Sequence, residues 1–254
     1  MESRGLVGFL RWFGELTFFV LNVFRATITP PFHFGELLRQ MYEIGVRSLP
    51  LVVLAGAAIG VVLSLHSRDS LVRFGATSLV PVLIVMSVIK ETGPIITALI
   101  VSGRVGAGIG AELGSMRVTE QIDAIEASAV DPVRLLAVTR VTACILMLPL
   151  LTIFANFSAI VMGWIANTVV EYISFTRYID SGFRVVNFSD LLPSTFRTAA
   201  FGAIIGVIGC FQGMRTKGGT EGVGRSATSS VVLSSLFVII ADVLLVRIIQ
   251  IIWG

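Results

Sequence analysis

Glu112 to Pro132 reads ELGSMRVTEQIDAIEASAVDP, a polar segment between two long apolar segments. Apolar residues recur in it near three- and four-residue steps while charged residues fill the spaces, which favours a helix with one buried stripe and one charged face. The stripe comprises Leu113, Met116, Ile122, Ile125 and Ala129, and the charged face comprises Arg117, Glu120, Asp123 and Glu126. Such a helix, held against a membrane domain, is where we expect a soluble partner to bind. The alternative is a solvated helix without a partner, since a charge run is usually a solvated face.

Composition places the chain among integral membrane proteins. It is 55% hydrophobic and only 14% charged, with a mean hydropathy of +0.90, outside the averages of soluble proteins. The net charge is +3, but the 19 Lys and Arg residues are scattered between apolar stretches, so nucleic-acid binding is not indicated. Cys144 and Cys210 lie inside apolar runs, so neither a disulfide nor a metal site is predicted.

The first 30 residues predict an amphipathic helix. Polar residues fall on one helical face, namely Arg4, Arg11, Glu15, Asn22 and Arg25. The other face carries Leu6, Phe9, Phe13, Leu16, Val20 and Phe24. A helix with aromatic residues opposite a polar stripe is expected to lie in the membrane interface instead of spanning it. Pro30 and Pro31 then end the helix.

Five apolar stretches are long enough to cross about 30 Å of hydrocarbon, which takes roughly 17 to 25 helical residues. They lie near Ser48–His66, Thr77–Ser102, Val141–Val170, Thr195–Met214 and Thr228–Val246. The chain is therefore predicted to be one all-α membrane domain over residues 1–254, with an interfacial helix (1–30) and five spans within 48–246. The polar segment between spans two and three supplies a further helix over 112–130.

The distribution of Lys and Arg predicts the orientation. With the N-terminus in the cytoplasm, twelve cationic residues fall inside: Arg4, Arg11, Arg25, Arg39, Arg47, Arg104, Arg117, Arg134, Arg140, Arg215, Lys217 and Arg225. Six fall outside: Arg68, Arg73, Arg177, Arg184, Arg197 and Arg247. This two-to-one bias places the polar segment in the cytoplasm and the C-terminus outside.

Lys90 and Glu91 lie near the middle of the second predicted span, where an ionisable residue costs at least about 2.5 to 3.5 kcal/mol on insertion scales. Gly93 and Pro94 follow, and we expect them to interrupt the helix. Pro94 cannot donate a hydrogen bond to the carbonyl of Lys90, so side-chain and backbone polarity coincide at one depth. The two interpretations are a polar cavity and a structural ion pair between Glu91 and a buried arginine of another helix.

Known catalytic motifs are missing from the sequence. Gly106, Gly110 and Gly114 stand at four-residue steps after an apolar span, which indicates close helix packing rather than a dinucleotide loop. Neither Lys90 nor Lys217 has the context of a phosphate-binding P-loop, and no GxSxG or HExxH pattern occurs. We therefore expect no ATP site, no cofactor and no enzymatic activity in this chain.

The run from Lys90 to Pro132, KETGPIITALIVSGRVGAGIGAELGSMRVTEQIDAIEASAVDP, resembles the signature region of the MlaE/YrbE family of permeases. The resemblance extends through GCFQGMRTKGGTEGVGRSATSSVV, Gly209 to Val232, and the order of spans agrees over nearly the whole chain. Members of that family are the membrane subunits of lipid-transporting ABC systems that work with MCE proteins.

The resemblance implies partners. Two permease copies would pair in the bacterial inner membrane above two cytoplasmic ATPase subunits, which bind ATP and Mg. A periplasmic ring of MCE-domain proteins would continue the lipid path, and a small STAS-domain protein would bind the ATPase. The polar segment corresponds to the family's coupling helix, which sits in a groove of the ATPase. The corresponding contact residues here are Glu112, Met116, Arg117, Glu120, Gln121, Asp123 and Glu126.

The resemblance also implies a phospholipid pocket between the two copies, with Glu91 and Lys90 beside it. Relatives often carry Arg at the position of Lys90 and Leu at that of Thr92. The implied function is ATP-driven phospholipid transport between the inner membrane and a periplasmic MCE protein, which maintains outer-membrane lipid asymmetry. An ion-coupled secondary transporter and a non-transporting membrane scaffold are the alternatives, although the internal repeats common in secondary transporters are not found.

Overall fold

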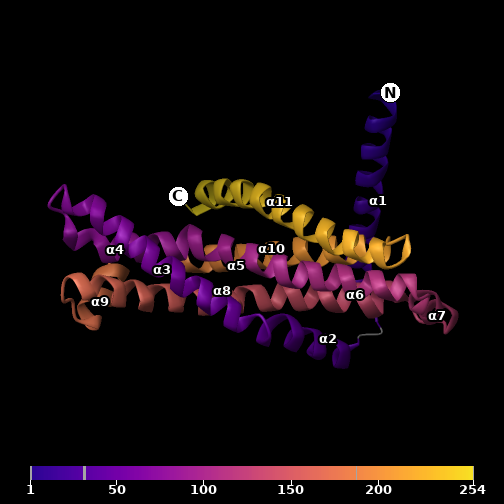
Figure 1. The fold of residues 1–254 in the computed structure, drawn as a ribbon, viewed down its shortest axis with the longest axis horizontal. Helices are drawn as coiled ribbons and strands as arrows, with labels where there is room; N and C mark the ends of the chain where they lie inside the picture. Colours follow the sequence, from indigo (N-terminus) through magenta and orange to yellow (C-terminus); the bar gives the residue numbers. More distant parts are fainter. Residues whose placement is uncertain (1, 31–32, 187, 254) are drawn as a thin grey trace.

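The computed structural model describes residues 2–30, 33–186 and 188–253, and within these ranges the regular structure is entirely helical. The helices form an elongated bundle whose long axis follows the apolar segments (Figure 1). In the first half the elements are α1 (Glu2–Ile28), α2 (Phe34–Met41), η1 (Tyr42–Val46), α3 (Leu49–Val72), η2 (Thr77–Leu79), α4 (Val80–Ser87), η3 (Val88–Thr92), α5 (Gly93–Val101), η4 (Ser102–Gly106) and α6 (Ala107–Val118). In the second half they are α7 (Gln121–Ala127), η5 (Val133–Val138), α8 (Thr139–Val170), α9 (Phe175–Phe183), α10 (Phe188–Met214) and α11 (Gly219–Trp253).

Five helical stretches within the described residues are long and apolar enough to cross a membrane: Phe34–Val72, Thr77–Val118, Val133–Val170, Leu191–Met214 and Gly219–Ile251. Each contains one of the five predicted spans, so the prediction of an all-α membrane fold with five spans is confirmed. The second stretch has 42 residues. At 1.5 Å per residue it is roughly 60 Å long, about twice the thickness of the hydrocarbon.

The second stretch is continuous, which corrects the expected interruption at Gly93 and Pro94. The helix widens into a π-helical turn, η3, and then resumes as α5 with Pro94 in its first turn. The amide of Gly93 donates to the carbonyl of Val88, five residues back. Because a π turn shifts the hydrogen-bond pattern, the missing amide of Pro94 is accommodated without ending the helix.

Glycines allow the helices to pack closely. A Cβ atom on Gly56 of α3 would lie 2.5 Å from the backbone oxygen of Ala155 in α8. On the opposite side of the bundle, a Cβ atom on Gly114 of α6 would lie 2.8 Å from the hydroxyl of Thr216, and one on Gly110 would overlap Ser230 of α11. The predicted role of the glycine stripe in helix packing is therefore confirmed.

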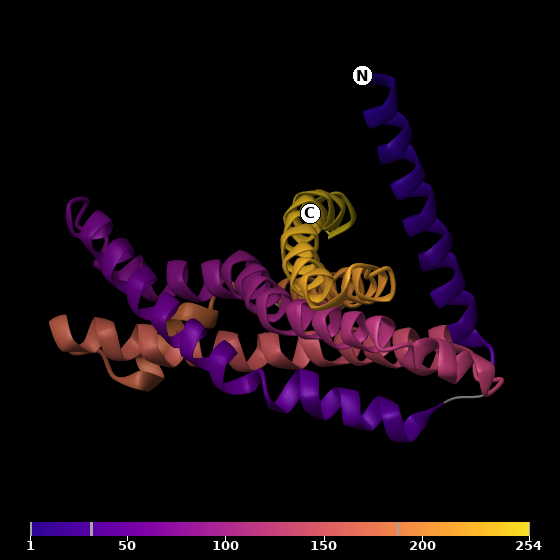
Figure 2. The ribbon, with the colours of Figure 1, turned by 45° about the vertical axis from the view of Figure 1, so that its right-hand side comes forward.

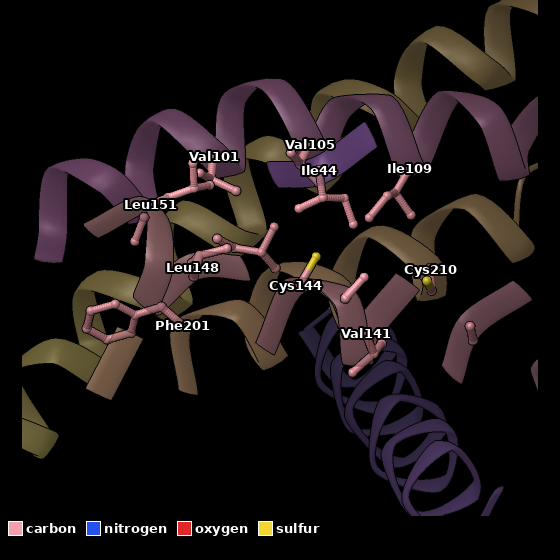
Figure 3. Packing of buried hydrophobic residues seen from close by; sticks show 14 of the residues in the cluster. Ile44, Val101, Val105, Ile109, Val141, Cys144, Leu148, Leu151, Phe201 and Cys210 are labelled. Atoms are coloured by element: carbon pink, nitrogen blue, oxygen red, sulfur yellow. The ribbon is translucent and has the colours of Figure 1, made fainter. Parts of the chain in front are cut away.

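The main apolar core lies where the α5–α6 segment, α8 and α10 meet. Its buried members include Val101, Val105, Cys144, Leu148 and Phe201, whose side chains are drawn in Figure 3. Cys144 and Cys210 are both free thiols and both buried, as the sequence predicts. This core fixes the second helical stretch and α10 relative to each other, and both carry charged residues described below.

The N-terminal helix α1 stands across the bundle and leaves it at one end (Figures 1 and 2). It contacts the bundle through aromatic and aliphatic side chains: the ring of Trp12 lies edge-on to Phe211, with ring centroids 5.8 Å apart, and Val23 is buried in the main core. Phe13 and Phe24 of the predicted apolar face are exposed. Pro31, and the side chains of Arg4, Leu6 and Phe9, lie outside the described residues. An apolar face directed away from the bundle, on a helix crossing its axis, is consistent with the predicted interfacial position.

The polar segment forms two helices instead of the single predicted helix. α6 continues the second span to Val118, and α7 follows after a turn in which Glu120 has a left-handed φ of 59°. Leu113 and Ile122 are buried as predicted, whereas Ala129 is exposed. Periodicity alone predicts a single helix because the apolar spacing persists across the turn.

Candidate functional site

A charged cluster lies inside the bundle at the level of η3. Arg197 of α10 is almost completely buried, with 3% of its side chain exposed. Its Nη2 lies 3.4 Å from Oε2 of Glu91, and its Nη1 lies 3.5 Å from Oδ1 of Asp242 in α11. One guanidinium therefore joins three helical segments that are far apart in the sequence. We call Lys90, Glu91, Arg197 and Asp242 the charged cluster.

The backbone of η3 takes part in the same arrangement. Pro94 has no amide hydrogen to offer the carbonyl of Lys90. Arg197 donates a hydrogen bond from Nη2 to that carbonyl oxygen. The buried arginine thus replaces the missing helical hydrogen bond and also neutralises the charge of two carboxylates. This explains why a π turn, a proline and a buried cation occur together.

The two carboxylates differ in their surroundings. The side chain of Asp242 is 11% exposed, whereas that of Glu91 is 53% exposed. Glu91 therefore presents a charged face at the surface of the bundle, within a membrane-spanning segment. The ion pair that the sequence left as one interpretation is present, yet half of the Glu91 side chain remains accessible to something outside this chain.

Arg197 and Asp242 were not predicted as site residues. Arg197 was assigned to the outer side of the membrane, which is wrong, because it lies inside the helix Leu191–Met214 and is buried. Asp242 interrupts the apolar run FVIIADVLLV of the last span, and this sequence signal could have identified it. Arg197 follows several polar residues in the sequence, so it does not stand out as a charge inside an apolar run.

The predicted coupling residues gather at the end of the bundle formed by α6 and α7, at the right of Figure 1. Arg117 of α6 pairs with Asp123 of α7 across the turn. Glu112 lies 2.9 Å from Nη2 of the buried Arg140 at the start of α8. Met116 is half-buried against the core, while Glu120, Gln121 and Glu126 are exposed.

These ion pairs divide the predicted coupling residues into two sets. Glu112 and Met116 attach α6 to the bundle, and the Arg117–Asp123 pair joins α6 to α7 across the turn. Glu120, Gln121 and Glu126 are the members that offer solvent-facing polar groups on α7 or its turn. The structure therefore brings all seven residues to one end but gives them different surroundings.

A polar cavity of about 320 Å³ lies between α2, η1 and the second span near the same end. Arg39, Glu43, Arg104 and Glu112 line it. Arg104 donates hydrogen bonds to Ser48 Oγ (2.7 Å) and to the carbonyl of Glu43 (3.1 Å). Within the residues that the structure describes, no group of three or more His, Cys, Asp or Glu is arranged to hold a metal ion.

These features define a class: an all-helical, multi-pass membrane protein with charged residues placed inside its bundle and an ion-paired helical hairpin at one end. The family model of the MlaE permease matches residues 37–248. The chain belongs to the MlaE permease family, and with it to the permeases of ABC transporters.

Several curated proteins are similar over most of their length. A probable ABC transporter permease protein of Rickettsia felis is 34% identical over 96% of this chain and 94% of its own. One of Synechocystis is 33% identical over 91% of this chain and 89% of its own. The chloroplastic Arabidopsis thaliana protein TRIGALACTOSYLDIACYLGLYCEROL 1 is 32% identical over 89% of this chain and 63% of its own.

Proposed function

We propose that this chain is the permease subunit of an ATP-driven phospholipid transporter, which moves lipid between the inner membrane and a periplasmic MCE-domain protein. In this role it maintains the lipid asymmetry of the outer membrane. Family membership supports the transporter class, and the name of the Arabidopsis relative refers to a glycerolipid.

The observation that carries the proposal is the half-exposed Glu91 above the buried Arg197. A carboxylate facing hydrocarbon is costly, so its exposed side requires a polar neighbour, which the described residues of this chain do not supply. A pocket between two copies of the chain, holding a lipid head group, provides such a neighbour. Lys90 and Glu91 set the polarity of this pocket, and apolar surfaces contact the acyl chains.

In the proposed mechanism, ATP and Mg bind to a cytoplasmic ATPase, and this ATPase binds the α6–α7 end of the permease. Closure of the ATPase subunits moves α7, and the Arg117–Asp123 pair transmits the movement to α6. Since α6 continues directly through η4 and α5 into η3, the displacement reaches Glu91 along one helix. Coupling of this kind requires each ligand to bind the two conformations with different affinities.

The remaining partners follow from the proposal. A second copy of the chain closes the pocket, a periplasmic MCE-domain ring receives or delivers the lipid, and a STAS-domain protein binds the ATPase. The chain lies in the bacterial inner membrane with its N-terminus in the cytoplasm. The excess of Lys and Arg on the cytoplasmic side of the predicted topology, twelve against six, supports this orientation.

Photo-crosslinking tests the pocket. A photoreactive amino acid at Glu91 is compared with one at Phe157, a 66% exposed apolar residue of α8, in the purified complex of permease and ATPase with labelled phospholipid. We expect strong labelling at position 91 that changes when ATP is added, and weak, ATP-independent labelling at position 157. Equal labelling at both positions would remove Glu91 from the pocket. Transport driven by an ion gradient without any ATPase would replace the proposal by a secondary transporter.

A further inference from the structure

A basic cavity of about 280 Å³ lies where α1, α10 and α11 meet, at the α7 end of the bundle. Three cationic side chains line it: Arg215 and Lys217 from the turn after α10, and Arg225 from the second turn of α11. The remaining lining residues are Trp12, Gln212, Thr216, Gly222, Ser226 and Ser229. The cavity is separate from the charged cluster, because the 18 residues from Arg197 to Arg215 span roughly 27 Å along α10.

The cations of this cavity are only weakly neutralised. Arg215 pairs with Glu15 of α1, and Arg225 pairs with Glu221 one turn earlier on α11. The side chains of Arg225 and Glu221 are 78% and 75% exposed, so their pair contributes little. Lys217 forms no ion pair within the described part of the chain. A phosphate, which offers several charged acceptors at once, can therefore compete for these cations.

Two further groups in the wall favour an anion. Gly222, Arg225 and Ser226 of the cavity wall belong to the first turns of α11, a 35-residue helix whose N-terminal end carries partial positive charge. Ser226 is 7% exposed, and its hydroxyl has no hydrogen-bond partner within the described residues. Buried hydroxyls are normally hydrogen-bonded, so this hydroxyl is an unused donor in the wall of the cavity.

The surroundings of the cavity fit a lipid better than a soluble phosphate. Trp12, on the helix assigned to the membrane interface, stacks on Phe237 of α11 with ring centroids 6.5 Å apart. Tryptophan is enriched at the head-group level of membranes. Beyond Ser229, an exposed apolar stripe continues along α11 at about one helical turn per step: Val232, Leu236 and Ile240. Cations at one end of an apolar stripe match a phosphate that carries acyl chains.

We propose that this cavity binds the phosphate of an anionic glycerophospholipid from the membrane leaflet at the α7 end, with its acyl chains along α11. Arg215, Lys217 and Arg225 contact the phosphate, and Ser226 lies in the wall beside it. The bound lipid links α1 to α10 and α11. The assignment rests on this cavity alone and does not depend on the proposed transport function.

Lipid retention tests the assignment. The full-length protein is reconstituted in nanodiscs of phosphatidylcholine containing phosphatidylglycerol, extracted into detergent, and examined by native mass spectrometry. We expect retained phosphatidylglycerol in the native protein and roughly 25-fold less in the Lys217→Gln/Arg225→Gln variant, since each cationic contact contributes about a factor of five. Arg47→Gln is the matched control, because Arg47 is an exposed, ion-paired arginine at the same end but outside the cavity.

Two variants separate the site from general surface charge. Glu221→Gln removes the carboxylate beside Arg225, so retention should rise. Ser229→Phe keeps every charge but occupies the cavity, so retention should fall. Unchanged retention in both variants, or an equal loss with Arg47→Gln, overturns the assignment. A soluble phosphate replaces the lipid as ligand if inorganic phosphate, added to the lipid-free protein, raises its melting temperature in the native form but not in Lys217→Gln/Arg225→Gln.

Discussion

Replacing Arg197 by methionine should destabilise the protein mainly through Asp242. The substitution keeps an unbranched side chain in the same space but leaves two carboxylates and the carbonyl of Lys90 without their common donor. Glu91 is 53% exposed and can be solvated by water or detergent head groups, whereas Asp242 is 11% exposed and cannot. The two carboxylates should therefore respond very differently to the loss of the cation.

The loss of stability in Arg197→Met depends on how deeply each carboxylate is buried rather than on its distance from Arg197. Two unit charges about 3.5 Å apart interact by about 5 kcal/mol at an effective dielectric constant of about 20, and both pairs have nearly this separation. Exposure reduces the contribution of Glu91 to about 1 kcal/mol or less. Leaving a buried carboxylate unpaired costs about 3 to 5 kcal/mol, so Arg197→Met should cost an amount in this range.

Thermal unfolding of the purified protein in detergent, followed by tryptophan fluorescence, measures the effect in a double-mutant cycle. Asp242→Asn added to Arg197→Met should recover about 2 kcal/mol or more, which corresponds to roughly 4 to 8 °C in melting temperature. Glu91→Gln added to Arg197→Met should recover about 1 kcal/mol at most. Equal recovery by the two substitutions, or no loss of stability in Arg197→Met, would refute the assignment of Arg197 as the partner of a buried Asp242.

Three further predictions use the same unfolding measurement. Gly110→Ala should destabilise the protein by about 1 to 3 kcal/mol, because the added Cβ overlaps Ser230. Gly108→Ala, which has no neighbour within 4 Å, should stabilise the protein by up to about 1 kcal/mol. The same effect at both glycines would contradict the close packing of α6 on α11. Glu120→Gly should stabilise by about 1 kcal/mol by relieving the left-handed backbone, and an equal gain from Glu120→Ala, which keeps the Cβ, argues against strain. Burial raises the pKa of the Tyr178 hydroxyl in the folded protein. The neutral hydroxyl therefore stabilises the fold fully below the pKa of about 10 that tyrosine has in the unfolded chain, and this stabilisation is lost as the pH rises beyond that value. Tyr178→Phe should therefore lose less stability than the native protein between about pH 8 and pH 11, and an identical loss in both proteins contradicts this.

The fold could be predicted from the sequence where one-dimensional signals are sufficient. Hydropathy identifies the five spans because each must match the thickness of the membrane on its own. The four-residue spacing of Gly106, Gly110 and Gly114 identifies a packing face because a helix repeats its surface every 3.6 residues. Neither argument requires knowledge of a residue's partners.

The arrangement of the candidate site depends on which residues contact one another across helices, and the sequence alone could not predict these contacts. Arg197 and Asp242 belong to different helices, and only tertiary packing brings them to Glu91. The turn at Glu120 was missed because its side chain does not reveal a left-handed backbone. The π turn at η3 was missed because Pro94 normally kinks or ends a helix, and its accommodation here depends on the hydrogen bond from Arg197.

The central claim is that the α6–α7 end couples a partner ATPase to lipid movement. Its most direct test is ATP-dependent phospholipid transport in proteoliposomes containing the permease, the ATPase and the MCE-domain protein. The test variant is Glu120→Arg/Glu126→Arg, which reverses two exposed charges and leaves the Arg117–Asp123 pair intact. Its matched control is Asp69→Arg/Asp180→Arg, which reverses two exposed carboxylates on α3 and α9, away from α7.

Glu120→Arg/Glu126→Arg should abolish both ATPase association and ATP-dependent lipid transport, while the control variant should retain both. Full association and full transport in Glu120→Arg/Glu126→Arg would contradict the central claim.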